Sequence, residues 1–235
     1  MVPESMNKGP KPQKSVRVKF TKTGSLKFIS HLDLNRTMQE VIVRSKLPVW
    51  YSEGFNPHPR IVFSPPLSVG VSSLTEFMDF KLVEEVPENE IVERLNSAFP
   101  KGLAALSCYV PETRFSDIKW GLYEIKYYAE NIPDDISARV KSVLTADSII
   151  VEKKTKSGDA KSVDISSGIR DVGAELCEDG ALKVSVKLSC GENSFVNPRF
   201  ISETLIKKIP EVFVGVEETV CRVAVYTENG ETLFS

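Results

Sequence analysis

The stretch Ile61–Val71, IVFSPPLSVGV, decides which fold the first half of the chain can adopt. Its apolar residues fall mostly at odd positions with serines between them, the period-two pattern of a strand with one buried face. Pro65 and Pro66 interrupt the pattern, and proline cannot donate a hydrogen bond to a neighbouring strand. The stretch therefore predicts a strand at the edge of a sheet, or one broken by a bulge.

The segments around this strand follow a regular order. We expect a strand, helix, strand, strand, helix and strand over residues 16–20, 30–47, 61–71, 76–83, 88–101 and 103–110. Ser30 is a suitable N-cap for the first helix, and Asp33 places a carboxylate near its N-terminus. This order is the split β-α-β unit of the ferredoxin-like fold, in which the second strand lies at an edge.

The second half repeats the order less clearly. We expect a strand, helix, hairpin, strand, helix and strand over residues 121–130, 136–144, 148–166, 181–189, 197–209 and 219–228, with the hairpin tip at 157–159. The prediction is an α+β protein of two ferredoxin-like (βαββαβ) units in tandem, at 15–111 and 120–235. Residues 1–14 are polar, proline-rich and basic, which predicts a disordered leader.

Composition narrows the cellular setting. The chain has 235 residues, 41% hydrophobic and 26% charged, with no apolar run near the roughly 20 residues that span a bilayer. The leader has no apolar core typical of a signal peptide, so we expect a cytoplasmic protein without membrane contact. The four cysteines are scattered and lack metal-ligand spacing, which predicts reduced thiols and no metal site.

Charge is distributed unevenly along the chain. Residues 1–60 hold eleven lysines and arginines against four acidic residues, a net charge of +7. Because the whole chain carries −2, the remainder carries −9. This asymmetry predicts a basic face for an anionic partner, RNA foremost, although an ordinary solvated surface gives the same pattern.

No catalytic or nucleotide-binding signature is present: the chain has no Walker A sequence, no G-x-G-x-x-G opening a helix, no H-E-x-x-H and no G-x-S-x-G. This absence argues against a self-sufficient nucleotide-dependent enzyme. For the same reason we expect no cofactor in this chain.

Two motifs hold most of the side chains suited to binding a ligand. They are SHLDLNR at residues 30–36 and YSEGFNPHPR at 51–60. The candidate binding residues are His31, Asp33, Asn35, Arg36, Tyr51, Phe55, Asn56, His58 and Arg60. We expect the two motifs to face each other in one site.

The second motif is predicted to form a rigid loop that holds its side chains ready for a ligand. Pro57 and Pro59 fix φ on both sides of His58, which lowers the entropic cost of presenting a ligand-binding loop. The alternative is a rigid connector with Phe55 packed in the core, and the alternative for His31 is a helix-start histidine bonded to a neighbouring loop. Two histidines flanking a phosphate could also act as acid and base in a metal-free endoribonuclease.

Both motifs, in VRVKFTKTGSLKFISHLDLNRTMQEV (16–41) and YSEGFNPHPRIVFSPPLSVGV (51–71), resemble a bacterial radical-SAM-associated domain family of unknown function. The likeness weakens to about residue 110 and is loose in the second half. Members of that family occur fused behind a radical SAM protein or encoded beside one. The resemblance implies a bacterial accessory protein whose radical SAM partner is a separate chain, because this sequence has no C-x-x-x-C-x-x-C.

Three functions remain open at this point. The first is an accessory or substrate-binding module, contacting RNA and working with a radical SAM partner. The second is the metal-free endoribonuclease with His31 and His58 as acid and base. The third is a purely structural interaction protein, whose binding would not weaken with salt as phosphate contacts do.

Overall fold

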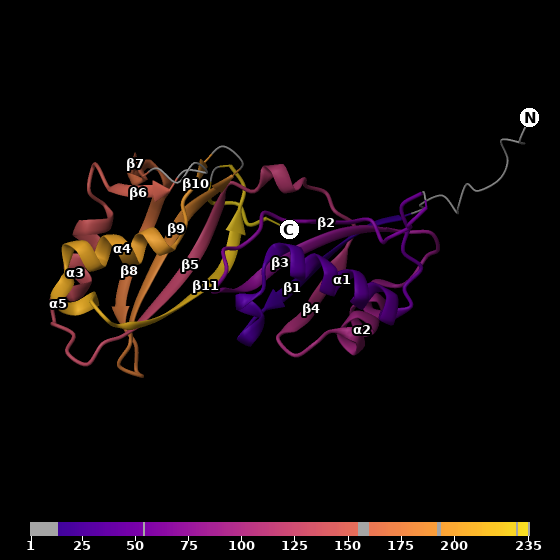
Figure 1. The fold of residues 1–235 in the computed structure, drawn as a ribbon, viewed down its shortest axis with the longest axis horizontal. Coiled ribbons are helices and arrows are strands. Elements are labelled where there is room, and N and C mark those ends of the chain that lie inside the picture. The colour runs from indigo at the N-terminus through magenta and orange to yellow at the C-terminus, as the bar shows by residue number, and fades with distance from the viewer. Residues whose placement is uncertain (1–13, 54, 155–159, 192–193, 229, 235) are drawn as a thin grey trace, which may run out of the picture. The chain divides into compact units, whose positions relative to one another are not determined.

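The computed structural model describes residues 14–53, 55–154, 160–191, 194–228 and 230–234. It is an α+β protein in which strands dominate, as expected for the class, and it divides into two units after Phe115 (Figure 1). No helix among the described residues is both long and apolar enough to cross a membrane. The predicted leader falls on residues 1–13, which are outside the described residues, and Lys14 already belongs to the first strand.

The first unit has the element order expected from the sequence. Its elements are β1 (Lys14–Lys22), the 3₁₀ helix η1 (Gly24–Phe28), α1 (His31–Ser45), β2 (Ile61–Phe63), β3 (Val71–Leu82), α2 (Glu88–Ala98) and β4 (Leu103–Tyr109). The strands pair antiparallel in the order β4-β1-β3-β2, which puts β2 at the end of this unit's order. The core lies between the sheet and the two helices, which contribute Leu34, Met38, Val41, Ile42, Ile91 and Leu95.

Local chemistry explains where α1 begins and ends. Ser30 is extended, and its Oγ accepts a hydrogen bond from the backbone amide of Asp33 at 3.1 Å, which confirms the predicted cap. Lys46 has a φ of 55°, in the left-handed region that ends helices, and Pro48 follows it closely. The cap fixes the position of His31, the first residue of the helix.

The predicted strand over 61–71 is too long. Strand β2 ends at Phe63, and Val71 is the first residue of the next strand, β3. The backbone amide of Ser64 still bonds to the carbonyl of Phe77 at 3.0 Å, but Pro65 and Pro66 lie beyond the strand. Two consecutive residues without an amide proton end the ladder, so the prolines terminate the strand instead of interrupting it.

Arg17 is buried, although its alternating surroundings predicted a half-exposed strand. Its side chain is 1% exposed and forms two 2.8 Å hydrogen bonds to the carboxylate of Asp79 on β3. It also donates to Thr113 Oγ1 at 2.7 Å and lies 4.4 Å from the ring centre of Phe115. Arg17 therefore ties the segment after β4 to the sheet, and it does not contribute to an exposed basic face.

The second unit contains the remaining elements. They are β5 (Trp120–Tyr128), α3 (Ile136–Leu144), β6 (Ile150–Lys154), β7 (Ala160–Asp164), β8 (Ile169–Leu176), β9 (Leu182–Gly191), β10 (Ser194–Phe195), α4 (Arg199–Lys208), α5 (Pro210–Phe213) and β11 (Glu217–Tyr226). Antiparallel pairing gives the order β8-β9-β5-β11, with β10 also pairing with β9. Strands β6 and β7 form a separate two-stranded sheet.

The second unit has three elements that the sequence did not predict, β8, β10 and the short helix α5. The sequence predicted the hairpin that became β6 and β7, but it did not predict β8, which pairs with β9 in the main sheet. Strand β8 follows a short 3₁₀ turn at Ser166–Gly168 and has no buried residue along its length, so apolar alternation gives little signal there. The predicted hairpin tip at 157–159 is outside the described residues.

The four cysteines are free thiols, as the scattered spacing predicted. Cys108 on β4 and Cys190 on β9 are buried. Burial raises the pKa of Cys108 to about 12 and that of Cys190 to about 11, because a thiolate loses its hydration there. Both thiols therefore behave as small apolar core groups at neutral pH.

Candidate functional site

The segment Tyr51–Arg60 is a loop closed at its base. Tyr51 forms a β-bridge with Pro59, and the amide of Ser52 donates to the carbonyl of His58 at 2.8 Å. The amide of His58 in turn donates to Ser52 Oγ at 3.1 Å. These bonds, together with the two prolines, fix the loop as the sequence predicted, although Gly54 is outside the described residues.

The imidazole of His58 is oriented by its own loop. Its Nδ1 lies 3.0 Å from Ser52 Oγ and 3.3 Å from the carbonyl oxygen of Asn56. Both contacts use the same ring nitrogen, and Nε2 has no hydrogen-bond partner among the described residues. The ring is exposed, so Nε2 is available to a ligand.

Phe55 is fully exposed, which excludes the connector with Phe55 packed in the core. A phenyl ring in water contributes nothing to folding, but it offers a flat face on which another ring can stack. Asn56 and Pro57 beside it are exposed as well. The most prominent side chain of the loop is therefore an unburied aromatic.

Two cationic side chains lie over the indole ring of Trp50, the residue just before the loop. The guanidinium of Arg60 lies 4.5 Å from the ring centre, and the ammonium of Lys81 on β3 lies 5.7 Å from it. Backbone bonds hold the three together, since Trp50 donates to the carbonyl of Lys81 at 2.7 Å and accepts from Arg60 at 3.2 Å. We refer to Trp50, Phe55, His58, Arg60 and Lys81 as the loop site.

Two members of the loop site were not predicted from the sequence. Trp50 stands one residue before the quoted motif, and its adjacency was the only available signal. Lys81 is distant in sequence and joins the site through the pairing of β2 and β3. Tyr51 is half-buried and packs against the core of the first unit, so its role there is structural.

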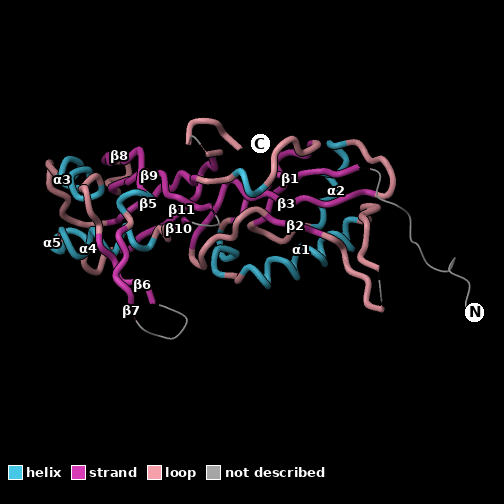
Figure 2. Tube along the Cα trace, turned by 90° about the horizontal axis from the view of Figure 1, so that it is seen from above, coloured by secondary structure: helices cyan, strands magenta, loops and turns pink. Residues whose placement is uncertain are grey.

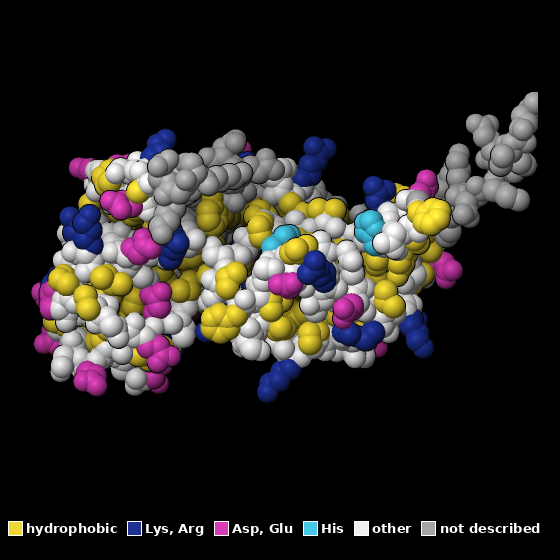
Figure 3. Space-filling model, viewed as in Figure 1, with side chains coloured by type: hydrophobic (Ala, Val, Ile, Leu, Met, Phe, Trp, Pro, Cys, Tyr) yellow, Lys and Arg dark blue, Asp and Glu magenta, His cyan; other side chains and the backbone are white. Residues whose placement is uncertain are grey.

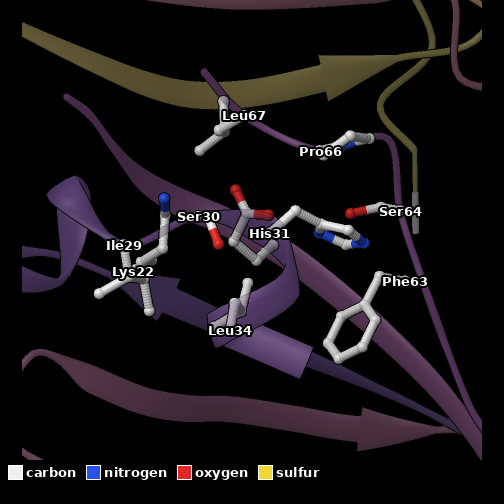
Figure 4. A pocket seen from close by; sticks show the side chains of 10 residues that line it. Lys22, Ile29, Ser30, His31, Leu34, Phe63, Ser64, Pro66 and Leu67 are labelled. Carbon is white, nitrogen blue, oxygen red and sulfur yellow. The ribbon is translucent and has the colours of Figure 1, made fainter. Parts of the chain in front are cut away.

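The first motif forms a different environment at the start of α1. The rings of His31 and Phe63 meet edge to face with centres 5.5 Å apart (Figure 4). Asp33 accepts from Ser30 Oγ at 2.7 Å and pairs with Arg36 at 3.5 Å. Asn35 bonds to Gln39 one turn later, so it is engaged within the helix.

A small hollow lies beside His31. It is lined by Lys22, Ile29, Ser30, His31, Leu34, Phe63, Ser64, Pro66, Leu67 and Glu76, and encloses about 10 Å³ (Figure 4). Lys22 and Glu76 are 3% and 4% exposed, so opposite charges from β1 and β3 lie inside the fold here. Space for about one water is too little for a substrate, which makes the hollow a structural feature.

The two motifs do not form one site. His31 contacts Phe63 at the end of β2, whereas His58 lies in the loop before β2, and no hydrogen bond, ion pair or ring contact joins the two motifs among the described residues. The two histidine side chains form separate cyan patches in Figure 3. Acid–base catalysis at one phosphate needs both groups within hydrogen-bond reach, so the geometry does not favour the paired-histidine endoribonuclease.

Across the part of the chain that the structure describes, no three histidine, cysteine, aspartate or glutamate side chains group closely enough to hold an ion.

Comparison with known proteins assigns the chain to a family. A family model described as "Uncharacterized protein conserved in bacteria (DUF2344)" matches residues 15–198. The chain belongs to this family. No match was found among curated proteins. The DUF2344 match covers both sequence motifs and the β6–β7 segment, but it does not address the radical SAM partner, which stays a prediction.

Proposed function

We propose that this DUF2344 protein is an accessory RNA-binding module that acts with a separate radical SAM protein. The observation that carries the proposal is the loop site, where an exposed aromatic, a free imidazole nitrogen and two exposed cations lie on one closed loop and its neighbouring strand. The module would present RNA to its partner and perform no bond chemistry itself.

The loop site suits single-stranded RNA by its chemistry. Unpaired bases stack on aromatic rings, and each stacked base contributes about 1–3 kcal/mol. The exposed ring of Phe55 can supply this contact, while Arg60 and Lys81 can bind phosphates. Glu53 is the one acidic side chain on the loop, and two cations outnumber it.

The fold that we propose for both units is compatible with a binding role. In each unit the element order is βαββαβ, apart from 3₁₀ helices and, in the second unit, the inserted hairpin, the short β10 and the short helix α5. The strand order is β4-β1-β3-β2 in the first unit and β11-β5-β9-β8 in the second. We propose that both units are ferredoxin-like, as the sequence predicted. A sheet with helices on one face is a rigid support for a binding loop, but the fold alone does not define function.

The radical SAM partner rests on the family resemblance of the two motifs. A test is affinity purification of the tagged full chain from its own bacterium, without salt washing, followed by mass spectrometry and RNA sequencing. The proposal expects a partner with a C-x-x-x-C-x-x-C motif, together with bound RNA. Recovery of neither would overturn it, and recovery of RNA alone would remove the radical SAM partner.

A further inference from the structure

The β6–β7 hairpin stands apart from the main sheet of its unit. Among the strands that the structure describes, β6 and β7 pair only with each other. Figures 1 and 2 both show them at the edge of the second unit. The hairpin interrupts the βαββαβ order of this unit, so it is an addition that the fold itself does not require.

The base of the hairpin is firmly held. The carboxylate of Asp164 accepts hydrogen bonds from the amides of Ile149 and Ser166 at 3.0 and 2.9 Å, and from Ser148 Oγ at 2.7 Å. These bonds hold the pKa of Asp164 well below its usual range, because they favour the charged form. The side chains of Ile149, Val151 and Ile165 are buried in the unit.

Beyond this base the hairpin has two like charges that lower its stability. Lys153 and Lys161 are directly opposite each other in the register, and both are exposed. Like charges at opposed positions destabilise a strand pair. Neither lysine forms an ion pair within the described residues, so no described acidic side chain offsets the repulsion.

The hairpin segment is also basic in sequence. Residues 153–161, KKTKSGDAK, contain four lysines and one aspartate. The alternation of the strands puts Lys153 and Lys161 on the face that they share with Val151 and Val163, while Glu152 and Ser162 lie on the other. A cationic face without exposed aromatic or apolar groups matches a phosphate backbone better than a protein surface.

We propose that the β6–β7 hairpin is a second RNA contact, in which Lys153 and Lys161 bind backbone phosphates without reading sequence. The proposal rests on the RNA binding proposed above and assigns the second unit its part in it. Bound phosphates neutralise the opposed ammonium groups, so repulsion that weakens the free hairpin becomes attraction in the complex.

The test is fluorescence anisotropy of the full chain with a labelled uridine homopolymer of about 20 nucleotides, longer than one single-strand site. The double variant Lys153→Gln and Lys161→Gln should weaken binding about tenfold at low salt. It should also reduce the slope of log affinity against log salt by about 1.4, since each single-strand phosphate contact contributes about 0.7. The matched control is Lys207→Gln with Lys208→Gln, two exposed lysines on α4.

The outcomes separate the two proposals. If the wild type binds and the hairpin variant binds equally well, or the α4 control loses as much, the hairpin inference is overturned and the loop site stands. If the wild type does not bind at all, both fail. As a check on folding, Lys161→Glu should keep or raise the melting temperature, because it creates an opposed Lys–Glu pair, and still weaken RNA binding.

Discussion

Arg60 holds its guanidinium 4.5 Å from the centre of the Trp50 ring, and its backbone amide donates to the Trp50 carbonyl at 3.2 Å. A cation over an indole face is attracted by the ring quadrupole, so the side chain is oriented before any ligand arrives. This contact joins the two ends of the exposed loop. It gives the loop that carries the unburied ring of Phe55 an oriented positive group.

Replacement of the exposed ring is the first prediction. Phe55→Ala should weaken binding of single-stranded RNA about 5- to 150-fold, the range expected for loss of one stacked base. The melting temperature should not change, because the ring is fully exposed and packs on nothing. Anisotropy titration and thermal unfolding measure the two effects.

Phe28→Ala is the matched control for this variant. Phe28 is an exposed aromatic on η1 of the same unit, with the ammonium of Lys27 over its ring, and it is outside the loop site. Its removal should leave RNA affinity unchanged. Equal losses in the two variants would show that any surface aromatic suffices, which is contrary to the proposed site.

The second prediction concerns the loop closure. Ser52→Ala removes the acceptor for the His58 amide and the contact with His58 Nδ1. The His58 amide should then exchange its proton faster, while global stability falls by about 1 kcal/mol or less. RNA affinity should fall less than in Phe55→Ala, because only the preorganisation is lost. Unchanged exchange at His58 would mean that Ser52 does not hold the loop.

The third prediction concerns the buried cation. Arg17→Met should lower the free energy of unfolding by about 3–5 kcal/mol, because Asp79 loses both hydrogen bonds of its ion pair. Adding Asp79→Leu should restore part of this loss. On the same strand, Lys14 pairs with Glu88 at 3.2 Å at the surface, and Lys14→Met should cost less than about 1 kcal/mol. Similar costs for the two single variants would contradict this account.

The fourth prediction follows from the buried thiols. Their folded-state pKa values of about 12 and about 11 lie above the ordinary value of 9.0, so the folded protein keeps both protons where the unfolded chain has released them. Stability is therefore unaffected below pH 9 and falls above it, by about 2–3 kcal/mol for the two thiols together at about pH 10.

Urea unfolding at about pH 8 and about pH 10 measures this loss. The variant with Cys108→Ala and Cys190→Ala should be less stable at both pH values, because each substitution leaves a cavity. Its stability should nevertheless depend less on pH. An unchanged pH dependence in the variant would show that other groups cause the alkaline loss.

Much of the fold could be predicted because its core follows simple periodicity. Val16, Val18 and Phe20 alternate along β1, and Leu34 and Met38 repeat at helical spacing on α1. Strand β8 could not be predicted, because its side chains are not buried and show no alternation. The end of β2 was predicted too late, since apolar residues continue past Phe63 where the ladder stops.

Local features of the site were predicted, but the contacts between its separate segments were not. Proline spacing correctly indicated a loop at 51–60, and the cap at Ser30 correctly placed His31, but the closure of the loop at Tyr51 and Pro59 was not predicted. Whether His31 and His58 meet depends on which end of β2 each approaches, and a single sequence does not encode that directly. Lys81 likewise joins Trp50 only through strand register.

The most direct test of the account is an RNA titration monitored by tryptophan fluorescence. The chain has two tryptophans, and only Trp50 lies in the loop site. The account predicts that single-stranded RNA quenches the wild type at low salt, that quenching disappears in Trp50→Phe while anisotropy still detects binding, and that added salt reverses both. No binding at low salt, or equal quenching in Trp50→Phe, would contradict it.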